Sequence, residues 1–87
     1  MNTEQIEHEL VLMKGKKVIV IVPNVGKASM SLGGELQVVQ TKEFTCGFHI
    51  HSPLGGWALI FFAEDVNSIE PSPSEPLIKV VRLKKTV

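Results

Sequence analysis

The chain has 87 residues, which is enough for one domain and too few for two. Hydrophobic residues make up 44% of the sequence and charged residues 21%, so the composition is that of a globular domain and not of a disordered segment. Nine basic and nine acidic residues give a net charge of zero, which argues against a polyanion binder driven by overall charge. We therefore expect one folded domain over residues 1–87.

The sequence shows no feature of export or membrane insertion. Its longest apolar stretches, residues 18–23 and 57–63, are far shorter than the roughly 20 residues that cross a bilayer. Glutamates precede the first lysine, so the N-terminus lacks the positive region and apolar core of a secretory signal. Cys46 is the single cysteine, which excludes a disulfide framework and fits a reducing compartment. The sequence therefore predicts a cytoplasmic protein with no membrane partner.

The first residues have the pattern of a helix. Asn2 is suited to cap its start, and apolar residues recur at helical spacing on one face from Ile6 to Met13. Gly15 can adopt the positive φ that commonly ends a helix. The sequence predicts a helix over residues 3–14 that lies on the surface and covers a core.

From Gly15 onwards the pattern is that of short strands separated by turns. Residues 18–22 form an unbroken β-branched run that ends at Pro23. A second strand, in one piece or two, follows as far as Val39, with a tight turn or sharp bend at Gly33 and Gly34. Further strands are expected around residues 48–50, over 57–63 and over 66–69, then a proline-rich loop over 71–76 and a strand or basic arm over 77–87.

Two of these strands are apolar on both faces. Residues 18–22 and 58–62 contain no polar position, whereas a strand with one solvated face alternates apolar and polar residues. A domain of this size has one core, so the helix or another subunit must cover the second face. We therefore expect a homo-oligomer joined edge to edge, and this contact closes into a ring if the rotation permits.

Three short motifs add a family resemblance. Residues 34–36 resemble a Gly-x-Leu motif, residues 62–69 a turn into a short strand, and residues 15–18 a Gly-Lys-x-Val motif. With the order of a helix and about five bent strands, they are similar to the Sm/LSm proteins, a small-barrel family that forms rings and binds RNA. The nearest type is the small Sm-like proteins of bacteriophages. The similarity runs from the helix to about Pro71 and implies a strongly bent five-stranded antiparallel SH3-like or Sm-like barrel over residues 15–70.

Two departures from the family bear on the ligand. Where the first family motif has an Asp and then an Asn that contacts a base, this chain has residues 40–44. Where the second motif has Arg-Gly, it has Ala63 and Glu64. The missing residues hold a uracil in the family's inner RNA site, and Glu64 and Asp65 would repel phosphate there. The resemblance therefore supports the fold more strongly than the ligand.

The corresponding loops still offer groups that bind single-stranded nucleic acid. Phe44 can stack a base, Lys42 can neutralise a phosphate and Asn67 can pair with a base edge. The alternative is structural: a core phenylalanine, a solvated lysine and a turn asparagine. A nucleic acid can instead bind another face of the domain. The candidate residues there are the lysines that follow the helix, the histidines His49 and His51, and the C-terminal lysines Lys84 and Lys85.

The sequence contains no recognisable catalytic or metal site. His49 and His51 share a strand face, which allows two imidazoles on one metal, but two ligands do not make a site. The same imidazoles can contact phosphate below about pH 6.5. Cys46 and a histidine are the one nucleophile and base pair, and no cation or helix N-terminus activates the thiol. No glycine-rich phosphate motif is present.

These observations predict a non-catalytic protein without cofactor or metal. The resemblance implies that it binds RNA or single-stranded DNA as a homo-oligomeric Sm-like ring of five to seven subunits, with a role in RNA or DNA processing. The alternative is a protein–protein assembly or structural module without a nucleic-acid ligand. Trp57, which follows two glycines, would then be a protein anchor, or else a plug at one end of the barrel.

Overall fold

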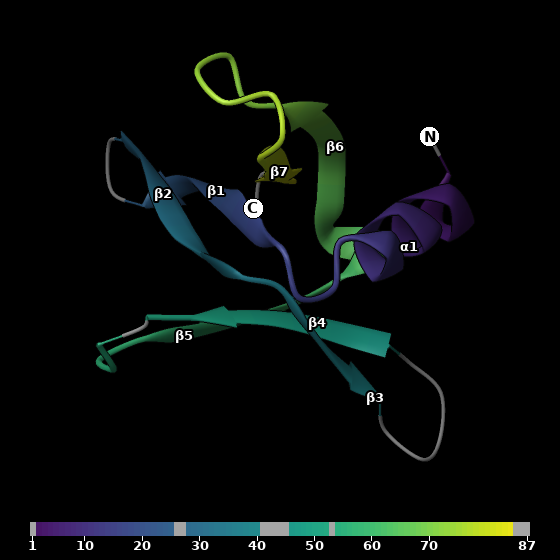
Figure 1. Cartoon of the computed structure of the whole chain (residues 1–87), viewed down its shortest axis with the longest axis horizontal. Coiled ribbons are helices and arrows are strands. Elements are labelled where there is room, and N and C mark those ends of the chain that lie inside the picture. Colours follow the sequence, from purple (N-terminus) through teal and green to yellow (C-terminus); the bar gives the residue numbers. More distant parts are fainter. Residues whose placement is uncertain (1, 26–27, 41–45, 53, 85–87) are drawn as a thin grey trace.

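The computed structural model describes residues 2–25, 28–40, 46–52 and 54–84. Within them the chain forms one α-helix, seven strands and a short 3-10 helix (Figure 1). The elements are α1 (Thr3–Leu12), β1 (Lys17–Val25), β2 (Ala28–Glu35), β3 (Gln37–Gln40), β4 (Cys46–His51), β5 (Ala58–Phe62), η1 (Ala63–Asp65), β6 (Val66–Pro71) and β7 (Lys79–Leu83).

The strands divide into two sheets. Sheet A has the order β2-β1-β7-β6, and sheet B has the order β3-β4-β5. All neighbouring strands run antiparallel except β1 and β7, which are parallel. The prediction of a mainly β domain with an N-terminal helix is confirmed. A closed five-stranded barrel is not what these sheets show.

Helix α1 begins where the sequence predicts and ends earlier. The Asn2 side chain accepts a hydrogen bond from the Gln5 N–H at 2.8 Å, and the Gln5 side chain accepts one from the Asn2 N–H at 3.0 Å, so a capping box fixes the start. The helix ends at Leu12, two residues before the predicted end at residue 14. Gly15 follows with φ of 80°, and its N–H donates to the Leu36 carbonyl at 2.8 Å. The chain thus leaves the helix through this glycine and turns into sheet A.

Strand β1 is longer than predicted. It continues through Pro23 to Val25, whereas the sequence indicated an end at Pro23. The pairing of β1 with β7 stops at the Ile21–Arg82 pair, so beyond it the described β1 has a partner only in β2. A proline is tolerated there because β7 no longer pairs and the register with β2 shifts between Val22 and Val25, so no regular ladder requires an N–H at Pro23.

The second strand bends at Leu36, not at Gly33 or Gly34. Both glycines lie inside β2, and Leu36 separates β2 in sheet A from β3 in sheet B. A β-carbon at Gly34 would lie 3.0 Å from the backbone oxygen of His51, so this glycine allows the two sheets to approach each other. Gly33 has no atom within 4 Å of such a carbon. The turn or bend expected at these two glycines is therefore wrong in position, and of the two alternatives that the sequence left open, the structure has the strand in two pieces.

The core lies between the two sheets and is closed at one end by α1 (Figure 1). Phe48 of β4 and Phe61 of β5 stack with ring centroids 5.9 Å apart, and both are almost fully buried. The largest fully buried side chains come from the helix, from five strands and from the junction of β2 with β3: Leu10, Val18, Val20, Leu36, Phe48, Ile50, Phe61, Val66 and Val81. The C-terminal segment therefore supplies a core strand, β7, and not only a basic arm.

Candidate nucleic-acid interface

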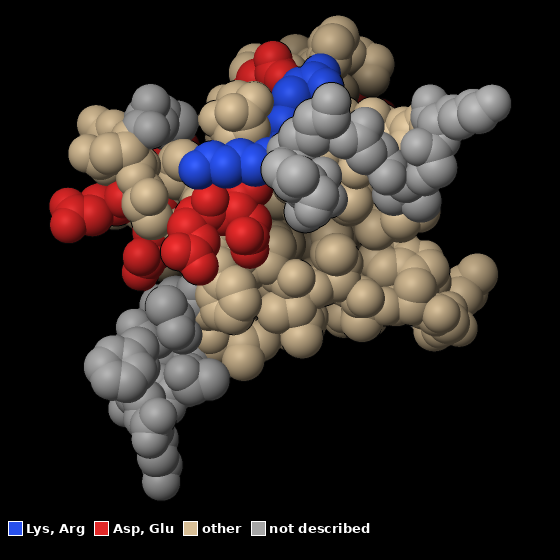
Figure 2. Space-filling model, turned by 180° about the vertical axis from the view of Figure 1, so that it is seen from behind, with Lys and Arg blue, Asp and Glu red and all other residues tan. Residues whose placement is uncertain are grey.

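The outer face of sheet B carries no formal charge among the described residues of its three strands. Strands β3, β4 and β5 contain no Lys, Arg, Asp or Glu. Figure 2 shows the lower half of the molecule, where these strands lie, without acidic or basic side chains among the atoms that the structure describes. We call this surface the uncharged face. Its outward residues are Gln37, Val39, Gly47, His49, His51, Ala58, Ile60 and Phe62.

Large apolar side chains stand exposed on the uncharged face. Ile60 is 65% exposed, Phe62 39% and Val39 38%. The alternate residues of the same strands, such as Phe48 and Phe61, face the core. Strand β5 is thus apolar on both faces, as the sequence indicated, and neither α1 nor sheet A covers its outer one. Contiguous exposed apolar surface on a small domain marks a binding surface.

Two histidines occupy the centre of the same face. His49 and His51 are successive outward residues of β4, and their ring centroids lie 5.9 Å apart. His49 stands opposite Ile60 of β5, and the exposed His51 opposite Ala58. The two imidazoles therefore project side by side from an apolar surface.

Carboxylates border the uncharged face at two places. Glu35, at the end of β2, accepts a hydrogen bond from the Gln37 amide at 2.7 Å. Asp65, in η1, accepts one from the Phe62 N–H at 2.9 Å. Glu64 beside it is exposed. Acidic groups thus stand at the edges of this face and not among its outward positions.

The parallel pairing of β1 with β7 brings two basic parts of the sequence together. Val18 pairs with Lys79, so Lys79 lies beside the start of β1, where Lys16 and Lys17 are exposed. We call these three lysines the basic end. Glu35 stands opposite Lys17 in the register of β1 with β2 and is the acidic neighbour of the cluster. No local sequence pattern indicates that these residues are neighbours, because the pairing joins strands about 60 residues apart in the chain.

The other predicted nucleic-acid residues are dispersed. Asn67 is exposed on β6, directly after η1. Lys84 is exposed at the opposite end of β7 from Lys79, and its N–H donates to the Asp65 carbonyl at 2.7 Å. Lys42, Phe44 and Lys85 lie outside the described residues. The structure therefore places the two histidines side by side on sheet B, while Lys84 follows strand β7 of sheet A.

A cleft of about 390 Å³ opens beside β5, where sheet B faces the ends of β1 and β7. Its lining is mainly apolar, with Lys84 and Asp65 as its charged residues. Strand β5 is the last strand of sheet B, so among the described strands its second edge has no partner. We call this feature the edge cleft, and its lining residues are Val22, Pro23, Leu59, Ile60, Phe61, Asp65, Leu83 and Lys84.

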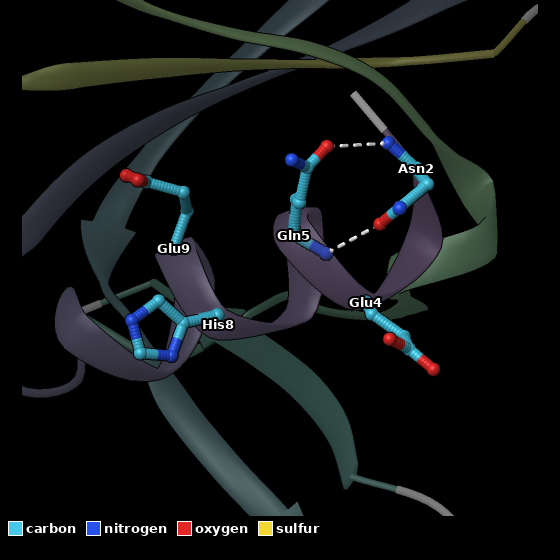
Figure 3. Close-up of a pocket in the computed structure, with 5 residues that line it drawn as sticks. All are labelled: Asn2, Glu4, Gln5, His8 and Glu9. Atoms are coloured by element: carbon cyan, nitrogen blue, oxygen red, sulfur yellow. Dashed lines mark hydrogen bonds between the residues drawn. The ribbon is translucent and has the colours of Figure 1, made fainter.

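A second hollow lies on the outer surface of α1 and does not form a site. It is shallow and open to solvent, and it is lined by Asn2, Glu4, Gln5, His8 and Glu9 (Figure 3). The carboxylate of Glu4 and the ring of His8 point away from each other. Within the described ranges, no group of three or more His, Cys, Asp or Glu residues is arranged to hold a metal ion. No described helix is long and apolar enough to cross a membrane.

Comparisons with known proteins add no relative. No protein-family model, no curated protein and no solved structure matches this chain.

Proposed function

We propose that this chain is a non-catalytic, nucleic-acid-binding protein that works as a homo-oligomeric ring of Sm-like subunits, with RNA or single-stranded DNA as its ligand. The observation that carries the ligand is the basic end, because it is the one place where the described part of the fold gathers lysines from distant parts of the sequence. Lys16 and Lys17 are exposed there, and Lys79 lies on the adjacent strand. Lysines at the adjacent ends of two neighbouring strands can contact phosphates of a nucleic-acid backbone.

The proposed ring depends on two strand edges of the same chain. Strand β5 ends sheet B and β6 ends sheet A, and neither has a second partner among the described strands. The edge cleft beside β5 is apolar, so it fits an extended strand of another copy. Pairing β5 of one subunit with β6 of the next is a head-to-tail contact, and such contacts close into rings when the rotation permits.

The order of the elements supports the Sm-like assignment. A helix precedes the strands, and the chain passes from sheet A to sheet B at Leu36. A single 3-10 turn, η1, joins β5 to the short strand β6. This order is the one that the resemblance implies. Strand β7 is an addition to the five strands of the Sm-like order, and in sheet A it lies between β1 and β6.

The test is an oligonucleotide titration at two salt concentrations. Anisotropy of labelled oligouridine and oligothymidine is measured with the intact oligomer at about 50 mM and about 200 mM salt. Three phosphate contacts predict an affinity loss of about twentyfold between these conditions. Lys17→Gln should lower the salt slope by about 0.7, while Lys84→Gln, at the far end of β7, should leave it unchanged. Absence of binding to either oligonucleotide at the lower salt rejects the nucleic-acid ligand.

The exposed Ile60 and Val39 favour a second candidate, a protein-assembly module with no nucleic-acid ligand. The same titration separates the two candidates. An assembly module forms the oligomer and leaves the oligonucleotide free at both salt concentrations.

A further inference from the structure

The aromatic ring of Phe62 rests on a glycine in the uncharged face. A β-carbon at Gly47 would lie 3.3 Å from Cε1 and 3.8 Å from Cδ1 of Phe62, so the ring packs against the backbone of β4 at this point. Phe62 is nevertheless 39% exposed. A side chain at position 47 would push the ring away from the strand. The glycine thus lets an aromatic ring lie on the sheet surface with part of it open to a ligand.

Two further planar side chains continue this surface along β4. His49 follows Gly47 at the next outward position, and His51 comes after it, with 5.9 Å between the imidazole centroids. Phe62 and the two histidines therefore form a row of planar groups on two adjacent strands. Single-stranded nucleic acids bind to such rows because every base has a face that stacks on aromatic or imidazole rings.

The described side chains that flank the row on the uncharged face carry no formal charge. The outward residues of β3 and β5 that flank the histidines, such as Gln37 and Ile60, do not ionise. The nearest acids stand at the borders, Glu35 at one end and η1, with Glu64 and Asp65, at the other, and Lys17 lies opposite Glu35. A protonated imidazole attracts phosphate, whereas a protein that covered this face would have to desolvate the two imidazoles.

We infer that the uncharged face is a stacking surface for single-stranded nucleic acid, with bases on Phe62 and His49 and with phosphates beside the imidazoles. The inference rests on the proposed function and assigns its base-binding site to the outer face of sheet B. It also predicts tighter binding at lower pH. A nucleic-acid strand on this face can extend to the basic end. Glu35, which contacts Gln37 at the start of β3, is paired with Lys17 of β1.

The test compares variants in the oligonucleotide titration at about pH 7.5 and about pH 5.5, at constant ionic strength. Phe62→Leu keeps an apolar side chain and removes the stacking ring, so it should weaken binding of oligouridine by about tenfold. The double variant His49→Gln/His51→Gln should abolish most of the pH dependence. His8→Gln is the matched control, because this histidine lies on α1 and should leave both quantities unchanged. Circular dichroism melts establish that each variant is folded.

The outcomes separate this inference from the proposed function. If the wild-type protein binds and neither Phe62→Leu nor the double variant changes affinity or pH dependence, the stacking site is wrong and the proposed function stands. If an intact oligomer binds no oligonucleotide at either pH, both fail. If Phe62→Leu alters the mass of the oligomer and leaves binding unchanged, the face is an interface between copies, and the inference is overturned.

Discussion

Two adjacent glycines of β2 have different roles, although they are the same residue type on the same strand. The virtual β-carbon of Gly34 meets a backbone oxygen of β4, which cannot move without moving the strand. That of Gly33 points into open space. The close approach of the sheets at the Leu36 bend therefore depends on one glycine and not on the pair. No sequence pattern distinguishes them, because the contact joins residues 34 and 51 across the fold.

This difference predicts unequal effects of two matched substitutions. Gly34→Ala should lower the free energy of unfolding by about 1–3 kcal/mol, because the added methyl group overlaps the His51 carbonyl. Gly33→Ala should be neutral or slightly stabilising, since alanine restricts the unfolded chain and meets nothing in the folded one. Urea denaturation of both variants at one protein concentration measures the difference. Equal stability of the two would contradict the close contact between the sheets.

At the scale of elements, local sequence patterns predict the presence of helices and strands well. They fail to predict where a strand ends when its end depends on a partner strand far away in the sequence. The capping residue and apolar spacing of α1, and the β-branched run of β1, are local signals, and both elements form. The end of β1 beyond Pro23 depends on where β7 stops, about 60 residues later in the chain. The basic end depends on the same parallel pairing of β1 with β7. The sequence therefore shows its lysines but does not predict that they lie on neighbouring strands. That the two histidines of β4 share a face follows from strand periodicity alone, so the sequence predicts it.

The capping box of α1 provides a test at this scale. Asn2→Ala removes the side chain that accepts the Gln5 N–H, and it should cost about 0.5–2 kcal/mol of folding free energy. Thr3→Ala, in the next and exposed position, is the control and should change stability by less than about 0.5 kcal/mol. Thermal melts followed by circular dichroism compare them. Because α1 closes one end of the core with Ile6 and Leu10, a weakened helix should destabilise the whole domain and not only fray its end.

At the scale of the whole molecule, the subunit leaves much apolar surface uncovered for its size. The core takes the inward residues of both sheets and one face of α1, and it leaves Ile60, with the rest of the uncharged face and the edge cleft, open. The sequence pattern predicts the cause of this exposed apolar surface, a strand that is apolar on both faces. It does not predict which strand edge stays open, because that depends on the position of β7 between β1 and β6.

If copies of the chain cover the edge cleft, stability must follow mass action. A hundredfold dilution should lower the melting temperature of the wild-type protein by roughly 10 °C, because only the folded subunit associates. Ile60→Asp places a carboxylate on the border of the edge cleft, where a neighbouring strand would bury it, so this variant should melt at a temperature independent of concentration. Leu77→Asp is the control, since Leu77 is 95% exposed in the loop before β7, and it should behave as the wild type. Light scattering on the same samples gives the mass of each species. A concentration-independent melt of the wild type, with the mass of one chain, would exclude the ring.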